Sequence, residues 1–170
     1  SVYGDLINQM DLQLDNFRLE NINADLFKAT KFWLPHSRTK GISQDKESGS
    51  WLACIGNPFS EKHQSLAGDD YTEQLLDDYL NCGIDAITEL SAPFVIVIYD
   101  GRDRMFHVIT DRVGLQHIYI AEQDDYIIIS TSSTVIASVI KVHLNKEAVT
   151  SYFMAGYLMG QNTFFERIEK

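Results

Sequence analysis

Short apolar segments of strand length, separated by turn residues, are the feature that most constrains the fold of this chain. Residues 93–99 are rich in β-branched and aromatic side chains, and the Asp100-Gly101 pair after them is typical of a tight hairpin turn. The side chains of residues 104–110 point alternately to the two faces of the predicted strand, and both faces are largely apolar. Two further segments of this kind lie at 117–121 and 126–130. This pattern predicts an antiparallel meander of four strands in a sheet that is covered on both sides.

Amphipathic segments on either side of these strands predict helices. Asp70 and Glu73 have the spacing of a capping box, and Gly83 is placed to end the helix that follows. A short helix is predicted over 85–90. After the strands, Ser132 or Ser133 can cap one helix, and Asn145 can cap the last one. The inward residues predicted for these two helices are Val135, Ile136, Val139 and Ile140, and then Ala148, Val149, Tyr152 and Phe153.

Composition excludes several classes of protein. A chain of 170 residues with 45% hydrophobic and 22% charged residues is typical of one globular domain. A formal net charge of -10 argues against nucleic-acid binding, which needs clustered Lys and Arg. The apolar runs are too short to span a membrane, and we expect no signal peptide. Cys54 and Cys82 have neither metal-ligand nor disulfide-framework spacing, so we expect a reducing, cytoplasmic location.

A polar break interrupts the first half of the chain. Residues 37–50, SRTKGISQDKESGS, carry Gly and Ser and have no apolar periodicity, so they predict an exposed loop. The apolar segment 51–55 then predicts a buried strand that ends at the turn Gly56-Asn57-Pro58. Trp51 and Trp33 are expected in the core or lining a pocket.

The order of motifs over residues 90–168 resembles a known family. A strand of the form F-x-x-x-x-Y-D is followed by a hairpin, by D-R-x-G-x-x-x-I-Y, and near the end by G-Y-L-x-G-x-x-T-F-F-E-x-I. This order is similar to the second half of the glutaminase domain that opens asparagine synthetases. That domain is a class II glutamine amidotransferase with the N-terminal-nucleophile (Ntn) hydrolase fold.

The resemblance implies an α+β fold: a four-layer αββα sandwich of two antiparallel sheets, formed by a single glutaminase-like domain over residues 1–170. We expect the apolar strand residues to lie between the two sheets. These residues are Phe94, Ile96, Ile98, Ile127 and Ile129.

The residues that carry out the family's chemistry are the ones from which this sequence departs. The family uses an N-terminal cysteine whose own amino group is the base, and the best local match places Tyr3 there. Its oxyanion hole is an Asn-Gly pair, which aligns with Ile55-Gly56, so the side-chain donor is missing unless Asn57 supplies it. We therefore expect a degenerate active site.

The substrate-binding positions differ in the same way. The family aspartate that holds the substrate's amino group aligns with Tyr71, next to Asp70, and Arg38 is a weak candidate for the carboxylate clamp. An alternative is that Ser1 acts as an N-terminal nucleophile in an active amidohydrolase. A third hypothesis is a stand-alone module that binds a small molecule in the former glutamine pocket. His107 and His117 are expected to pack in strands rather than to act as bases.

The retained Asp111-Arg112-Val113-Gly114 motif is expected to be structural, with hydrogen bonds or an ion pair that fix a tight turn and with Gly114 at positive φ. The resemblance further implies an ATP-pyrophosphatase synthetase domain, absent from this chain, as partner in cis or in trans. ATP and Mg²⁺ would be bound there, and no cofactor is expected in this chain. We expect contact with that partner, or with a second copy in a homodimer, through the Asp111 turn and the helix at 145–157, which is rich in aromatic residues and Met.

Overall fold

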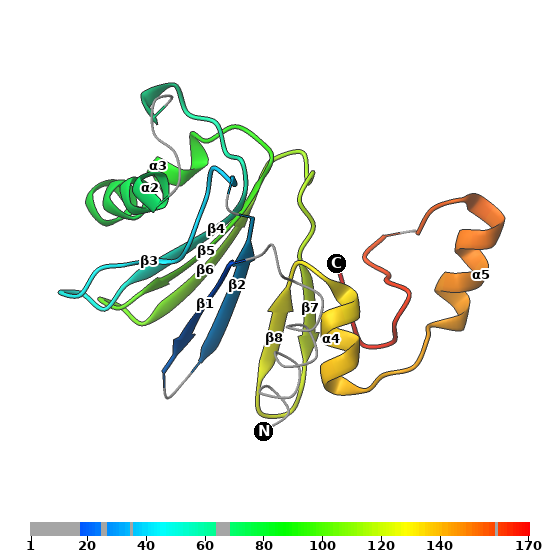
Figure 1. Cartoon of the computed structure of the whole chain (residues 1–170). Helices are drawn as coiled ribbons and strands as arrows, with labels where there is room; N and C mark the ends of the chain where they lie inside the picture. The colour runs from blue at the N-terminus through cyan, green and yellow to red at the C-terminus, as the bar shows by residue number, and fades with distance from the viewer. Residues whose placement is uncertain (1–17, 25–26, 35, 64–68, 159) are drawn as a thin grey trace. The chain divides into compact units, whose positions relative to one another are not determined.

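The computed structural model describes residues 18–24, 27–34, 36–63, 69–158 and 160–170 (Figure 1). The chain forms two compact units. We call them the sheet unit, which holds the described residues up to Gln116, and the C-terminal unit, His117–Lys170.

The sheet unit is built on a four-stranded antiparallel sheet. Its strands follow the order β3 (Ser43–Gln44), β4 (Trp51–Gly56), β5 (Phe94–Asp100) and β6 (Met105–Thr110). Helices α2 (Asp69–Cys82) and α3 (Asp85–Thr88) cover one face of this sheet, as Figure 1 shows, and a 3₁₀ turn, η1, spans Glu61–His63. The buried residues between helices and sheet are Leu52, Cys54, Tyr71, Leu75, Leu76, Tyr79, Ile87, Phe94, Ile96 and Ile98.

A second sheet packs on the other face. Strands β1 (Arg18–Asn23) and β2 (Lys28–Trp33) pair antiparallel, and Ile22 and Ala29 pack against Trp51 and Ala53 of β4. An aromatic cluster joins the same layers and contains Phe27, Trp51, Tyr99 and Phe106. The sheet unit therefore has three layers: helices, a four-stranded sheet and a two-stranded sheet.

This arrangement corrects one prediction about strand faces. Phe94, Ile96 and Ile98 were expected between two sheets, but they face helix α2, whereas Val97 and Tyr99 face β1 and β2. The side chains of β5 do alternate, as the period of a strand requires. Because both faces of β5 are apolar, the alternation alone could not decide which set faces the second sheet.

The C-terminal unit has a small sheet of its own. Strands β7 (Tyr119–Glu122) and β8 (Ile127–Ser130) pair antiparallel, and Glu169 bridges Ile120 on the outer side of β7. Helix α4 (Ser133–Ile140) covers one face through Ile136 and Ala137, and helix α5 (Lys146–Ala155) follows. The mixed α+β class with antiparallel sheets agrees with the prediction, and the four-layer sandwich remains a prediction.

Two predictions for this unit are wrong. The strands do not form one meander, because within the described residues β5 and β6 belong to one sheet and β7 and β8 to another. Ile127 and Ile129 are exposed, and Ile128 between them packs in the core with α4. The register pairs Ile128 with the buried Ala121, which puts its two neighbours on the opposite face.

Local capping signals predicted the helix ends well. The Ser132 hydroxyl accepts a hydrogen bond from the Val135 N–H, and the Asn145 side chain accepts one from the Ala148 N–H. The Gly83 N–H bonds to the Tyr79 carbonyl after the end of α2. The predicted capping box is wrong in one respect: α2 begins at Asp69, so Asp70 lies in its first turn and is not the N-cap. The prediction that Tyr152 and Phe153 point inward from α5 is wrong, since both are exposed.

The polar segment 37–50 is not a uniformly exposed loop. Thr39, Ile42 and Ser50 are buried, and Ser43–Gln44 forms the edge strand β3. Hydrogen bonds to distant groups draw this polar chain inward, among them the bond from the Ile42 N–H to the Glu20 carboxylate at 2.7 Å. Within the described parts of the chain, no helix is long and apolar enough to cross a bilayer.

Candidate functional site

The end of strand β4 forms the centre of the predicted site. Gly56 has a φ of +94°, and a Cβ atom added there would lie 2.5 Å from the Pro93 carbonyl oxygen. Only glycine fits this backbone conformation and this close approach. The Asn57 N–H donates to the same Pro93 oxygen at 2.9 Å. The turn after β4 is therefore held against the residue that precedes β5.

Helix α2 brings Tyr71 to this turn. Its side chain is fully buried, and its hydroxyl group donates a hydrogen bond to the Pro58 carbonyl at 2.8 Å. The Arg38 guanidinium lies over the Tyr71 ring, 4.8 Å from its centroid, and the Thr39 hydroxyl donates to the Gly56 carbonyl at 2.8 Å. The structure therefore brings Arg38, Gly56 and Tyr71 together.

The Asp111 turn after β6 is the second predicted motif, and it is organised by one buried carboxylate. Asp111 Oδ1 accepts hydrogen bonds from the N–H groups of Val113 and Leu115, and Oδ2 from those of Phe94 and Gln116. Burial alone would raise the pKa of Asp111, but these backbone donors together lower it below its usual value. Gly114 has a φ of +65°, as predicted. Arg112 is exposed, so Asp111 provides the bonds that hold the turn.

A comparison of the sequence with models of protein families covers the residues of this site. The family model of the glutamine amidotransferase domain matches residues 55–170, which include the Gly56 turn, Tyr71 and the Asp111 turn. The chain belongs to the glutamine amidotransferase domain family. A comparison with curated proteins gave no match.

The groups around the Gly56 turn include few free hydrogen-bond donors and no charged group at Tyr71. Ile55 has no hydrogen-bond donor in its side chain, and Asn57 is exposed with its backbone N–H already bonded. Burial raises the pKa of Tyr71, with Arg38 opposing in part, so its phenol is neutral near pH 7. A neutral phenol carries no charge that could pair with a cationic group. Asp70, one residue earlier, is exposed. Ser1 and Tyr3 lie outside the described residues.

A buried lysine, which no sequence pattern predicted, supports the segment next to the site. Lys31 of β2 donates from Nζ to the carbonyl oxygens of Gly41 at 2.6 Å and Thr39 at 3.3 Å. A cavity of about 240 Å³ lies beside this segment and is lined by Glu20, Trp33, Lys40, Gly41, Ile42 and Ser43. Lys31 could not be distinguished from an exposed strand lysine by sequence alone, because its acceptors are backbone groups.

Cys54 of β4 does not have the properties of a nucleophile. The side chain is fully buried, and burial raises the pKa of its thiol to about 12, with the charge of Lys31 acting in the opposite direction. The thiol form is inert compared with the thiolate. Among the described residues, no group of three or more His, Cys, Asp or Glu side chains could hold a metal ion.

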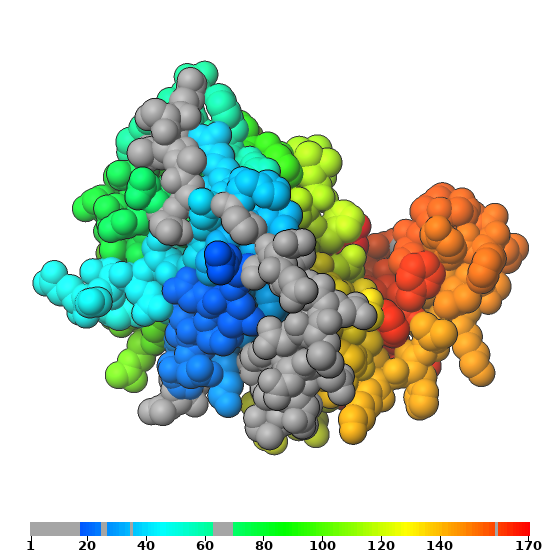
Figure 2. All heavy atoms as spheres, viewed as in Figure 1, coloured from blue at the N-terminus to red at the C-terminus, as the bar shows by residue number. Residues whose placement is uncertain are grey.

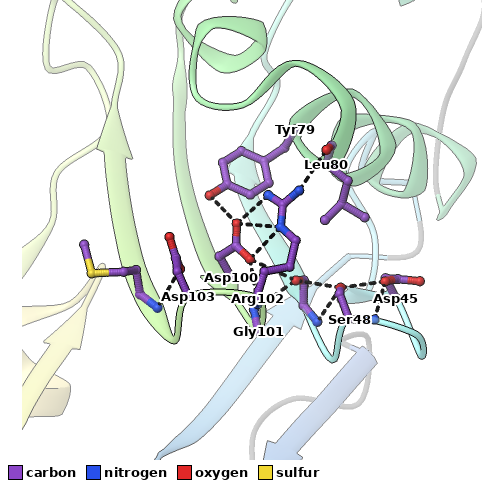
Figure 3. Close-up of polar contacts among 10 residues, drawn as sticks. Asp45, Ser48, Tyr79, Leu80, Asp100, Gly101, Arg102 and Asp103 are labelled. Carbon is purple, nitrogen blue, oxygen red and sulfur yellow. Dashed lines mark hydrogen bonds and ion pairs between the residues drawn. The ribbon is translucent and has the colours of Figure 1, made fainter.

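At the other end of β5, a polar network links four segments (Figure 3). The buried Asp100 carboxylate accepts hydrogen bonds from the Tyr79 hydroxyl, at 3.0 Å, and from the Arg102 side chain and backbone. Arg102 also donates to the Leu80 carbonyl at 2.9 Å. The Ser50 hydroxyl, which accepts from the Gly101 N–H at 2.9 Å, connects the network to the segment before β4. The Tyr-Asp pair of the strand motif was the only signal for it in the sequence.

Proposed function

We propose that this chain is the glutaminase-like domain of an asparagine synthetase-like enzyme, that it does not hydrolyse glutamine, and that it serves as scaffold and interface. Its partner is an ATP-dependent, amide-forming synthetase domain, in cis or in trans. That partner binds ATP and Mg²⁺, and this chain requires no cofactor of its own.

The observation that carries this proposal is the environment of Tyr71. A carboxylate at this position would bind the amino group of glutamine, but the buried, neutral phenol donates to the Pro58 carbonyl instead. The missing side-chain donor at Ile55 adds to this loss, because one oxyanion donor is typically worth a factor of about 10² to 10³ in rate. The changes at Ile55 and Tyr71 lie in one turn region. Together they support a scaffold role for a domain whose pocket no longer hydrolyses glutamine.

The exposed side chains of α5 support the interface role. Phe153 and Met154 are 83% and 84% exposed, and Tyr157, just beyond the helix, is 58% exposed. The atoms of this segment form the orange surface in Figure 2. Exposed aromatic and Met side chains in one place are typical of protein interfaces. Of the other residues at the end of this segment, Leu158 is half-buried and Met159 lies outside the described residues.

A glutaminase assay tests the proposed loss of activity. The protein, with its N-terminus verified by mass spectrometry, is incubated with glutamine, and ammonia is measured against buffer. We expect no release above buffer for the wild type or for Ser1→Ala. Ammonia release by the wild type that Ser1→Ala abolishes would contradict the proposal and favour the amidohydrolase hypothesis.

Co-purification tests the interface. The chain is expressed with whatever synthetase domain is encoded next to it or continuous with it, and Phe153→Asp and Met154→Asp are each compared with Tyr126→Asp, an exposed position on the β7–β8 hairpin. We expect the two α5 variants to lose at least tenfold in affinity and the control to bind as the wild type does. Equal binding by all three would remove α5 from the interface.

A further inference from the structure

We draw no further inference here: the strongest candidate, the exposed apolar face of the β7–β8 sheet in the C-terminal unit with Ile120, Ile127 and Ile129, has no partner among the described residues, and nothing in the structure shows what covers it.

Discussion

The hydroxyl group of Tyr79 donates a hydrogen bond to Oδ2 of Asp100 across 3.0 Å, which ties helix α2 to the end of strand β5. Arg102, two residues after Asp100, donates hydrogen bonds to the same carboxylate. The buried Asp100 charge therefore has one charged partner, Arg102, and one neutral donor, the Tyr79 hydroxyl. Such a group stabilises the fold only while it is ionised and its partners stay in place.

Replacing this carboxylate should weaken the fold in a pH-dependent way. The Arg102 side chain, with further donors, holds the pKa of Asp100 well below its usual value despite burial. Because the pKa of Asp100 is lower in the folded than in the unfolded protein, ionised Asp100 stabilises the fold. This contribution is fully present above the unfolded-state pKa, about 3.9, and is lost as the pH falls toward the folded-state pKa. Asp100→Asn should reduce the free energy of unfolding by about 2 to 4 kcal/mol at pH 7. Urea denaturation should show this difference shrinking below about pH 4.

Asp103→Asn is the matched control for Asp100, because it changes an exposed aspartate on the same hairpin. Its effect at pH 7 should stay within about 0.5 kcal/mol. The same loss in both variants, or a difference for Asp100→Asn that does not depend on pH, would contradict the role given to this network.

Gly56 and Gly114 should differ in their tolerance of alanine, although both have positive φ. At Gly56 a Cβ atom meets the Pro93 oxygen at 2.5 Å, whereas at Gly114 nothing lies within 4 Å of it. Gly56→Ala should therefore cost about 2 kcal/mol or more, and Gly114→Ala about 1 kcal/mol, the strain of the backbone conformation alone. Thermal unfolding of both variants checks this, and equal losses would mean that the turn after β4 can relax.

The Asp111 turn should depend on both carboxylate oxygens. Asp111→Asn keeps one acceptor oxygen, so two of the four backbone N–H groups face an NH₂ group instead. We expect a loss of about 1 to 3 kcal/mol in the free energy of unfolding. Arg112→Gln, at the exposed neighbour, should change it by less than about 0.5 kcal/mol. A larger effect for Arg112→Gln than for Asp111→Asn would indicate that an ion pair of Arg112, and not the bonds to the Asp111 carboxylate, holds the turn.

The two cysteines should react very differently. Cys54 is buried with a thiol pKa of about 12, and Cys82, the last residue of α2, is exposed. A thiol reagent at pH 8 should label one thiol in the native protein and two in denaturant, and Cys82→Ser should abolish the native labelling. Fast labelling of Cys54 in the native state would show that β4 is not covered as described.

Features that depend on a few neighbouring residues were predictable from the sequence. The caps at Ser132 and Asn145 and the end of α2 at Gly83 are local, because the side chain or the flexible backbone and the groups that it satisfies lie within four residues of each other. The hairpin at Asp100-Gly101 and the tight turn at Gly114 belong to the same class.

Features of the candidate site were partly predictable. The residue types at Ile55 and Tyr71 could be read directly from the sequence, and the hypothesis that two polar groups of the family are absent rests on them. The bond from Tyr71 to Pro58 and the position of Arg38 over the ring join segments far apart in the sequence. No local pattern encodes such contacts, so only the packing of α2 on the sheet could reveal them.

The sequence by itself determined where most helices and strands begin and end, and that the sheets are antiparallel, because capping, turn chemistry and strand periodicity act over a few residues. Only the tertiary structure decided which apolar face of β5 meets the helices, and that Ile128 is covered while Ile127 and Ile129 are exposed. It also decided that Lys31 and Asp100 are buried. The physical reason is that burial is a property of two surfaces in contact. When both faces of a strand are apolar, or the partner of a charge is a distant backbone carbonyl, the sequence permits either arrangement, and the packing selects one.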